Sequence, residues 1–216
     1  MKAFHSFDLG EDEVINGVKP LELLRAEGEA VFKYGVQDQT VIDIGAWDGW
    51  YSFEAERLGA SEVTASDWFC WDEGPGWGTR EVFDHVHAHL GSNVKKLTVD
   101  IPELSPGTHG TYDVVLMLGV LYHVRDMLTT LERACNLSRR MIVVETATIP
   151  DELPIARYWP VDSLHPSDYT NFWTPSTGLV CAMLTQFGFS RVEYTPTPMA
   201  HQGEDVTRHI FHAWRW

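Results

Sequence analysis

The chain has 216 residues, of which 44% are hydrophobic and 22% charged, a composition typical of a soluble globular protein with one full core. Its 31 acidic and 16 basic residues give a formal net charge of −15, which opposes a nucleic acid substrate because binding a polyanion requires a basic surface. No apolar run approaches the roughly 20 residues that span a bilayer, and the N-terminal sequence MKAFHSFDLGEDE lacks the apolar segment of a signal peptide, so we expect a cytoplasmic protein without a membrane partner.

Strand and helix patterns alternate along most of the chain. The first helical pattern, residues 20–34, begins at Pro20 and stops at Gly35, so residues 1–36 are predicted to form an N-terminal helical cover. Further helices are predicted from the glycine loop to residue 58 and over residues 80–90, 126–137 and 174–187. Strands are predicted at residues 40–44, 62–66, 94–99, 112–118, 141–145, 191–194 and 209–216.

This order predicts an α/β fold in which crossover helices connect parallel strands and cover both faces of a Rossmann-like sheet. No repeat or linker divides the sequence, so residues 1–216 are expected to form a single domain. Residues 149–174 contain four prolines and five aromatic residues and are too long for an ordinary connection. They follow the fifth strand on the side where ligands bind in open α/β sheets, and we interpret them as a substrate lid whose Tyr158 and Trp173 contact the substrate.

The segment TVIDIGAWDG indicates a nucleotide site. Gly45 and Gly49 permit close approach of a ligand to the backbone, and Asp67 closes the next strand about 20 residues on, where a carboxylate can hydrogen-bond ribose hydroxyls. Dinucleotide sites need the pattern G-x-G-x-x-G, and the bulky Trp47 leaves poor room for a pyrophosphate. S-adenosylmethionine (SAM) has no phosphate, so we predict a SAM-dependent methyltransferase. An NAD(P)-dependent reductase is disfavoured because no tyrosine has a lysine four residues later.

Acidic residues end several strands at the expected ligand edge. Asp43 is expected to orient the glycine loop or the methionine ammonium group. Asp100 is expected to accept the adenine amino hydrogens, with an Asx turn as its structural alternative, and Glu145 is either a substrate contact or a structural cap. The predicted donor contacts are Asp43, Gly45, Ala46, Gly49, Asp67, Trp68, Asp100, Ile101 and Leu118.

The sequence GVLYH follows the fourth strand and places Tyr122 and His123 beside the methyl group. Histidine is a suitable base near neutral pH, so His123 is a candidate catalytic base and otherwise a structural histidine. His85 and His89 share one face of their predicted helix while His87 points elsewhere, which favours a solvated helix face over a metal site. Three widely spaced cysteines match neither a zinc pattern nor a disulfide framework, so no metal is predicted.

The motifs GVLYHVRD, DIGAWDG, VTASD and NFWTPS together resemble the class I SAM-dependent methyltransferases. Among these, the chain is similar to the branch that contains the tRNA wobble-uridine carboxymethyltransferases and their small relatives, over nearly its whole length. The resemblance implies a seven-stranded sheet with an antiparallel last strand. It also draws attention to Asn171, which begins the N-x-x-x-P-S element, as a substrate contact.

The tRNA enzymes use carboxy-SAM, whose extra carboxylate is held by a lysine, a tyrosine and an arginine. By resemblance, these are Lys19, Tyr122 and Arg208 in this chain. The acidic net charge and the lack of the longer N-terminal region of those enzymes oppose tRNA as substrate. The predicted substrate contacts are Lys19, Tyr158, Asn171, Trp173 and Arg208.

The leading hypothesis is therefore methyl transfer from SAM to a small-molecule acceptor. The alternatives are carboxymethyl transfer from carboxy-SAM and a non-catalytic module that binds SAM. The patterns predict neither the acceptor nor the oligomeric state.

Overall fold

The computed structural model describes residues 2–10, 13–72, 79–160, 170–198 and 206–215. The chain forms two compact units, one up to Glu103 and one from Leu104 onward. Within the described ranges, no helix combines the length and the apolar character that crossing a bilayer requires.

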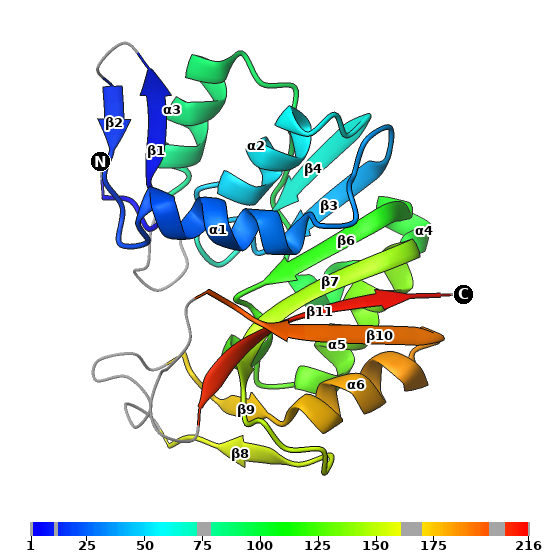
Figure 1. Ribbon diagram of the computed structural model, residues 1–216. Coiled ribbons are helices and arrows are strands. Elements are labelled where there is room, and N and C mark those ends of the chain that lie inside the picture. Colours follow the sequence, from blue (N-terminus) through cyan, green and yellow to red (C-terminus); the bar gives the residue numbers. More distant parts are fainter. Residues whose placement is uncertain (1, 11–12, 73–78, 161–169, 199–205, 216) are drawn as a thin grey trace. The chain divides into compact units, whose positions relative to one another are not determined.

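The first unit contains a parallel three-stranded arrangement. Strand β3 (Thr40–Ile44) pairs with β4 (Glu62–Ser66), and β4 pairs with β5 (Lys95–Leu97), all in parallel. The helices are α1 (Leu21–Val31), α2 (Trp50–Arg57) and α3 (Glu81–Leu90), and the unit ends with the short helix η1 (Ile101–Glu103) (Figure 1). Four of the five residues of β3 are buried, as expected for a parallel strand that is covered on both faces.

The predicted N-terminal helical cover, residues 1–36, is wrong for its first half. Only α1 is helical, and an antiparallel hairpin of β1 (Phe7–Gly10) and β2 (Glu13–Ile15) precedes it (Figure 1). The chain between hairpin and helix is extended because it pairs with the segment before β1. The backbone N–H of Lys19 donates to the carbonyl of Phe4 at 2.7 Å, and Ser6 bonds the carbonyl of Lys19 through both its backbone and its hydroxyl.

The second unit contains a four-stranded arrangement in the order β10, β11, β7, β6. Strands β6 (Tyr112–Leu118) and β7 (Ser138–Thr148) are parallel, whereas β11 (Thr207–Trp214) is antiparallel to both β7 and β10 (Arg191–Pro196). Its helices are α4 (Pro106–His109), η2 (Leu121–His123), α5 (Met127–Leu137) and α6 (Thr177–Gln186). Together the units supply the seven strands that the sequence predicts, mostly parallel with an antiparallel last strand, so the Rossmann-like fold is confirmed.

The start of α6 differs from the prediction. Residues 174 and 175 were expected to cap and begin this helix, but they lie in a short strand, β9 (Trp173–Pro175), which pairs antiparallel with β8 (Ala156–Tyr158). Ser176 caps the helix instead, and its Oγ accepts the backbone N–H of Leu179 at 3.0 Å. A serine oxygen satisfies one of the N–H groups that a helix start leaves open, which explains the shift of the boundary.

The predicted lid therefore contains regular structure on both sides of residues 161–169, which lie outside the described residues and include Tyr169. The backbone N–H of Trp159 donates to the carbonyl of Phe172 at 2.9 Å, and the Trp159 indole donates to Thr174 Oγ1 at 2.7 Å. These bonds tie β8 and its flank to β9.

Candidate functional site

The glycine loop follows β3 in the first unit. Gly45 and Gly49 both have positive φ, 78° and 84°, and the N–H of Gly45 donates to the carbonyl of Ser66 at the end of β4 at 2.8 Å. A Cβ on Gly49 would lie 2.4 Å from the ring of Phe83. Position 49 therefore needs glycine both for its backbone conformation and for the packing of Phe83.

Trp47, in the middle of the loop, also has a positive φ of 49°. Its N–H donates to Asp67 Oδ2 at 2.9 Å, and its carbonyl accepts the indole N–H of Trp71 at 2.7 Å. The Trp47 ring stacks on Phe4, with ring centroids 4.5 Å apart and planes 9° from parallel. Contacts from the segment after β4 and from Phe4 thus fix this residue in a conformation that bulky side chains rarely adopt.

Asp67, the predicted ribose contact, lies directly after β4 and is 6% exposed. Besides accepting the N–H of Trp47, its carboxylate accepts the N–H of Cys70 through Oδ1 at 2.8 Å. Burial raises the pKa of Asp67, and these backbone N–H groups act in the opposite direction. The backbone N–H groups of Phe69 and Trp68 also hydrogen-bond this carboxylate. Its bonds to the backbone fix Asp67 at the end of β4 beside the glycine loop, and the ribose contact stays a prediction. Trp68, which follows, is 39% exposed.

Asp43 lies in β3, directly before the glycine loop. Its carboxylate is buried and accepts the hydroxyl of Ser52 on α2 at 2.7 Å. Burial raises the pKa of Asp43 to about 7, the Ser52 bond opposes this rise, and the charge of Asp67 adds to it. Asp43 therefore connects the end of β3 to α2, and its orienting role stays a prediction.

Asp100 precedes η1 and is only partly buried. Its Oδ1 accepts the N–H of Ile101 at 2.8 Å, and its carbonyl accepts the N–H of Glu103 at 3.0 Å. The structural alternative for this residue, a local turn, is thus present. One carboxylate oxygen is used in that turn, which leaves the adenine contact of Asp100 and Ile101 as a prediction.

The N-terminal segment joins the glycine loop through residues that sequence reasoning missed. Asp48 is 1% exposed, and its Oδ2 accepts the backbone N–H groups of Phe4 at 2.7 Å and His5 at 2.8 Å. Burial, and to a lesser extent the charge of Lys19, lower the pKa of His5 to about 3, so this histidine is neutral. The position of Asp48 within the loop is the only sequence signal for this role.

Lys19 is part of a buried cluster in the same unit. Its ammonium forms an ion pair with Glu27 on α1 and lies 3.0 Å from the hydroxyl of Tyr51 on α2. Glu27 is 2% exposed, so the charge of Lys19 is already compensated inside the protein. Neither Glu27 nor Tyr51 was a candidate from the sequence, because each is an ordinary helix residue in its local pattern.

A second cluster lies in the other unit, where Arg208 and Glu145 form a buried bidentate ion pair. Arg208 Nε lies 2.6 Å from Glu145 Oε1, and Nη2 lies 2.7 Å from Oε2. The guanidinium carbon also lies 4.9 Å from the ring centre of Tyr122, and Arg208 hydrogen-bonds the Tyr122 side chain. Gly119, with φ 73°, follows β6 and faces these three side chains. The predicted residues Tyr122 and Arg208 are thus brought together, and Leu118 is the last residue of β6.

His123 lies beside the lid. Its Nδ1 is 3.0 Å from the carbonyl oxygen of Thr170 and 2.9 Å from the Thr170 hydroxyl, and its ring centre is 4.0 Å from that of Tyr122. The N–H of Phe172 donates to the carbonyl of Tyr122 at 2.9 Å. These contacts hold Thr170 and Phe172, which precede β9, against η2. Asn171 lies between these two residues in the chain and is 3% exposed.

The two lid aromatics predicted as substrate contacts differ in exposure. Tyr158 is 56% exposed, and its ring meets that of Trp173 edge-on, with centroids 5.3 Å apart. The Trp173 indole donates to the carbonyl of Arg125 at 3.1 Å. Trp173 is therefore anchored to the segment after η2, whereas Tyr158 lies on the surface of the lid.

The three histidines of α3 have structural partners. Glu13 on β2 contacts two of them, with Oε1 2.6 Å from His85 Nε2 and Oε2 3.3 Å from His89 Nδ1. His87 instead lies 3.0 Å from the carbonyl of Val94. In the described ranges, no group of three histidine, cysteine or carboxylate side chains could hold a metal ion. The shared face of His85 and His89 thus docks the hairpin on α3.

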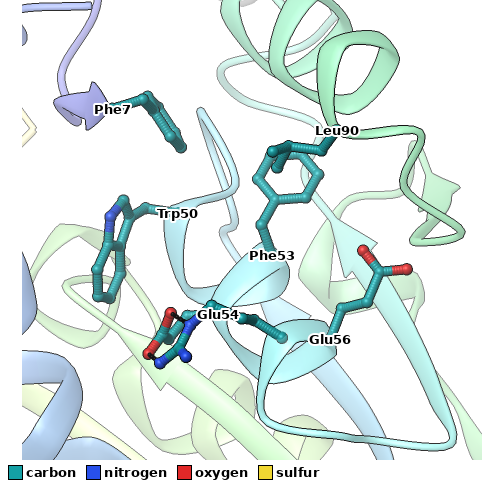
Figure 2. Close-up of a pocket in the computed structure, with 7 residues that line it drawn as sticks. Phe7, Trp50, Phe53, Glu54, Glu56 and Leu90 are labelled. Atoms are coloured by element: carbon teal, nitrogen blue, oxygen red, sulfur yellow. Dashed lines mark hydrogen bonds and ion pairs between the residues drawn. The ribbon is translucent and has the colours of Figure 1, made fainter. Parts of the chain in front are cut away.

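A surface pocket of about 270 Å³ opens beside α2 (Figure 2). On its rim, Arg57 forms an ion pair with Glu54 through Nε and Oε2 at 2.7 Å. The pocket contains none of the predicted site residues. Its lining consists of Phe7, Trp50, Phe53, Glu54, Glu56, Arg57 and Leu90.

A comparison with known protein families identifies the family of this chain. Residues 19–204 match the methyltransferase domain family, and the chain belongs to this family. This assignment confirms the resemblance to class I SAM-dependent methyltransferases. A tRNA U34 carboxymethyltransferase from Campylobacter fetus subsp. fetus is 26% identical over 117 residues, which are 54% of this chain but only 34% of that enzyme.

Solved structures share the fold at low sequence identity. The N-terminal domain of EvdMO1, with S-adenosylhomocysteine (SAH) and D-fucose, has a TM-score of 0.64 at 18% identity, covering 95% of this chain and 84% of its own. The 1,6-didemethyltoxoflavin-N1-methyltransferase of Burkholderia thailandensis, with bound 1,6-didemethyltoxoflavin and SAH, has a TM-score of 0.64 at 17% identity, covering 89% of this chain and 77% of its own. Magnesium protoporphyrin IX methyltransferase from Synechocystis, with SAM, has a TM-score of 0.62 at 16% identity, covering 90% and 79%.

Proposed function

We propose that this protein is an enzyme that transfers a methyl group from SAM to a small-molecule acceptor. The observation that carries the proposal is the glycine loop, in which Gly45 and Gly49 have positive φ and the carboxylate of Asp67 fixes the backbone at Trp47. Membership of the methyltransferase domain family supports it. Structural neighbours with SAM or SAH bound, among them enzymes that act on small molecules, support the same donor.

The residues of the first unit fit the donor chemically. Asp67 would hold the ribose. The adenine would be bordered by Trp68, Asp100 and Ile101. The backbone at Gly45 and Ala46 would approach the methionine part, and Asp43 would orient this loop. SAM, when bound, supplies an electrophilic methyl group on a sulfonium centre. All other groups of this loop serve to bind and orient it.

The acceptor is proposed to react beside η2. With Nδ1 donating its hydrogen to the carbonyl of Thr170, the lone pair of His123 lies on Nε2. His123 Nε2 would take the proton that the attacking oxygen or nitrogen loses, and Tyr122 would orient the acceptor through its hydroxyl, itself held by Arg208. Asn171 and Trp173 would contact the acceptor from the lid, with Tyr158 at its outer surface.

Carboxymethyl transfer from carboxy-SAM is the second candidate, because of the similarity to a tRNA U34 carboxymethyltransferase. Both cations that it would need are already compensated by buried carboxylates, Lys19 by Glu27 and Arg208 by Glu145. This compensation and the net charge of −15 favour SAM and an acceptor that is not a nucleic acid. Mass spectrometry of ligand carried through purification separates the donors, since carboxy-SAM is heavier by one carboxylate group.

The direct test is stabilisation by the donor. A ligand at 100 times its dissociation constant stabilises the folded state by about 2.7 kcal/mol, which is a rise in Tm of roughly 5–11 °C for a chain of this size. We expect this rise with SAM, and we expect Asp67→Ala to abolish it. Asp8→Ala is the control, because Asp8 is half-exposed in β1 and its ion pair with Arg25 is long, 3.6 Å. No stabilisation of the wild type by SAM would refute the proposal.

We also propose a cytoplasmic location. Cys70, Cys135 and Cys181 are all free thiols, and burial raises the pKa of Cys135 to about 12 and raises that of Cys70 further. Thiols that are kept protonated in this way are unreactive, as expected for a reducing compartment without structural disulfides. Fractionation of cells that express the tagged full chain tests this location, and recovery outside the cytoplasm would contradict it.

A further inference from the structure

Asn171 is a buried polar side chain without a hydrogen-bond partner among the described residues. It is 3% exposed, and neither its Oδ1 nor its Nδ2 makes a hydrogen bond to any residue that the structure describes. The nearby hydroxyl groups of Thr174 and Ser176 have hydrogen-bond partners. Thr174 Oγ1 accepts the indole N–H of Trp159, and Ser176 Oγ accepts the backbone N–H of Leu179. Compared with Thr174 and Ser176, Asn171 therefore stands out by the hydrogen bonds that its side chain lacks.

The backbone on both sides of Asn171 is fixed. Thr170 contacts the His123 ring through its carbonyl and its hydroxyl, and the N–H of Phe172 donates to the carbonyl of Tyr122. The guanidinium of Arg125 lies 5.4 Å from the centre of the Phe172 ring. Asn171 is thus held alongside η2, just beyond the carboxyl end of β6, where open α/β sheets bind ligands.

A buried carboxamide that lacks both its donor and its acceptor partner lowers stability, because folding removes it from water without replacement. An apolar side chain of similar size would avoid this loss. Such a group beside a reactive site is explained when a ligand supplies the missing hydrogen bonds.

We propose that Asn171 determines acceptor specificity by pairing with a lactam-like edge, that is, a ring N–H adjacent to a carbonyl. A carboxamide presents an acceptor next to a donor in one plane, and a lactam presents the complementary pair. The aromatic side chains of the lid, among them Trp173, suit a planar ring of this kind. This inference rests on the proposed methyltransferase function and adds the chemical class of the acceptor.

The first experiment measures the Tm of the unliganded protein. Replacing Asn171 by leucine removes two unsatisfied polar atoms, so we expect Asn171→Leu to raise Tm by about 2–4 °C. Thr170→Val is the matched control, because it deletes a hydroxyl that is bonded to His123, and it should lower Tm. A fall in Tm for Asn171→Leu as large as that of the control would overturn the proposal.

The second experiment measures binding of three probes in the presence of saturating SAH by calorimetry. They are 2-quinolone, which has the lactam edge, N-methyl-2-quinolone, which lacks the N–H, and coumarin, in which oxygen replaces it. The wild type should bind 2-quinolone at least about tenfold more tightly than either analogue, since each lost hydrogen bond to a buried group costs on the order of a factor of ten. Asn171→Leu should remove this preference.

Equal affinities of the wild type for the three probes, or no binding of 2-quinolone, overturn the assignment of Asn171. The Tm of the wild type with and without SAH is measured in the same series. A failure of the proposed function, in which SAH leaves Tm unchanged, is thereby distinguished from a failure of the acceptor assignment alone.

Discussion

The substitution Glu145→Gln tests how strongly the Arg208 cluster depends on its buried ion pair. Glu145 is 2% and Arg208 is 9% exposed, and they share two hydrogen bonds of 2.6 and 2.7 Å. Burial lowers the pKa of Arg208, but the charges and hydrogen bonds of Glu145 and Tyr122 together outweigh burial and hold this pKa well above its ordinary value. Because a guanidinium has an ordinary pKa above about 12, Arg208 stays charged when Glu145 is neutralised.

Removal of one member of a buried ion pair leaves an uncompensated charge and costs about 3–5 kcal/mol. For a chain of this size, this loss corresponds to a fall in Tm of roughly 6–20 °C. The double variant Glu145→Leu with Arg208→Met buries no charge, so we expect it to recover most of the lost stability, with a coupling energy of about 2 kcal/mol or more between the two positions.

Urea unfolding of the wild type, the single variants Glu145→Leu, Glu145→Gln and Arg208→Met, and the double variant at pH 7 gives the free energies for this cycle. Circular dichroism and tryptophan fluorescence should report coincident transitions. Losses below about 1 kcal/mol for the single variants, or losses that simply add in the double variant, would refute the view that the pair is desolvated and coupled.

Three further predictions concern stability. Because the pKa of Asp43 rises from 3.8 to about 7 on folding, the folded state binds the proton more tightly, so wild-type stability falls as the pH rises from about 4 to about 7. Asp43→Asn should therefore match the wild type at pH 4 and exceed it by up to about 4 kcal/mol at pH 8 in urea unfolding, and a constant difference would contradict this. Gly49→Ala should lower the free energy of unfolding by about 2–5 kcal/mol, because position 49 has a positive φ and an added Cβ would overlap Phe83. Gly35→Ala is the control: its φ is 71° and the space around it is open, so only the conformational cost should remain. Equal losses of stability for the two variants would contradict this prediction. Ser176→Ala should lose at least about 1 kcal/mol of stability, because it removes the helix cap and the bonds of the same hydroxyl to the Ile155 N–H and the Leu153 carbonyl. An unchanged Tm would show that these bonds are not needed.

The parallel strands could be predicted because each is a short apolar run, rich in β-branched residues, between turn or helix signals. The bounds of β3, β4 and β6 are those predicted, at residues 40–44, 62–66 and 112–118. In contrast, β7 extends over Ser138–Thr148, beyond the predicted 141–145, because β11 pairs with it as far as Thr148. Strand length here depends on a partner that is distant in sequence.

The two small antiparallel pairs were missed for the same reason. The β1–β2 hairpin is docked through Glu13 on histidines of α3 that follow more than 70 positions later. The β8–β9 pair depends on the Trp159 indole and on the contact of Phe172 with Tyr122. Neither pair has a strong local pattern, and short hairpins need tertiary contacts for stability.

For the candidate site, the sequence indicated which residue types matter but not their partners. Local motifs selected Asp67 and Tyr122, the resemblance to a known family selected Arg208, and the family match agrees with the class of protein that was predicted. The carboxylates that compensate Lys19 and Arg208 lie in other elements, and no spacing rule connects Arg208 with Glu145, 63 positions earlier. The pairing of Arg208 with Glu145 depends on the register of β11 against β7.

Trp47 illustrates how packing replaces a local conformational preference. A bulky residue with φ 49° costs about 1–2 kcal/mol relative to glycine. Its two backbone bonds, to Asp67 and Trp71, and its stacking on Phe4 offset this cost, since an aromatic pair alone contributes about 0.5–1.5 kcal/mol beyond its buried area. Asp48 adds two bonds to the same N-terminal segment. The loop geometry that small residues usually provide is therefore maintained by tertiary contacts, which makes the segment around Phe4 part of the proposed donor site.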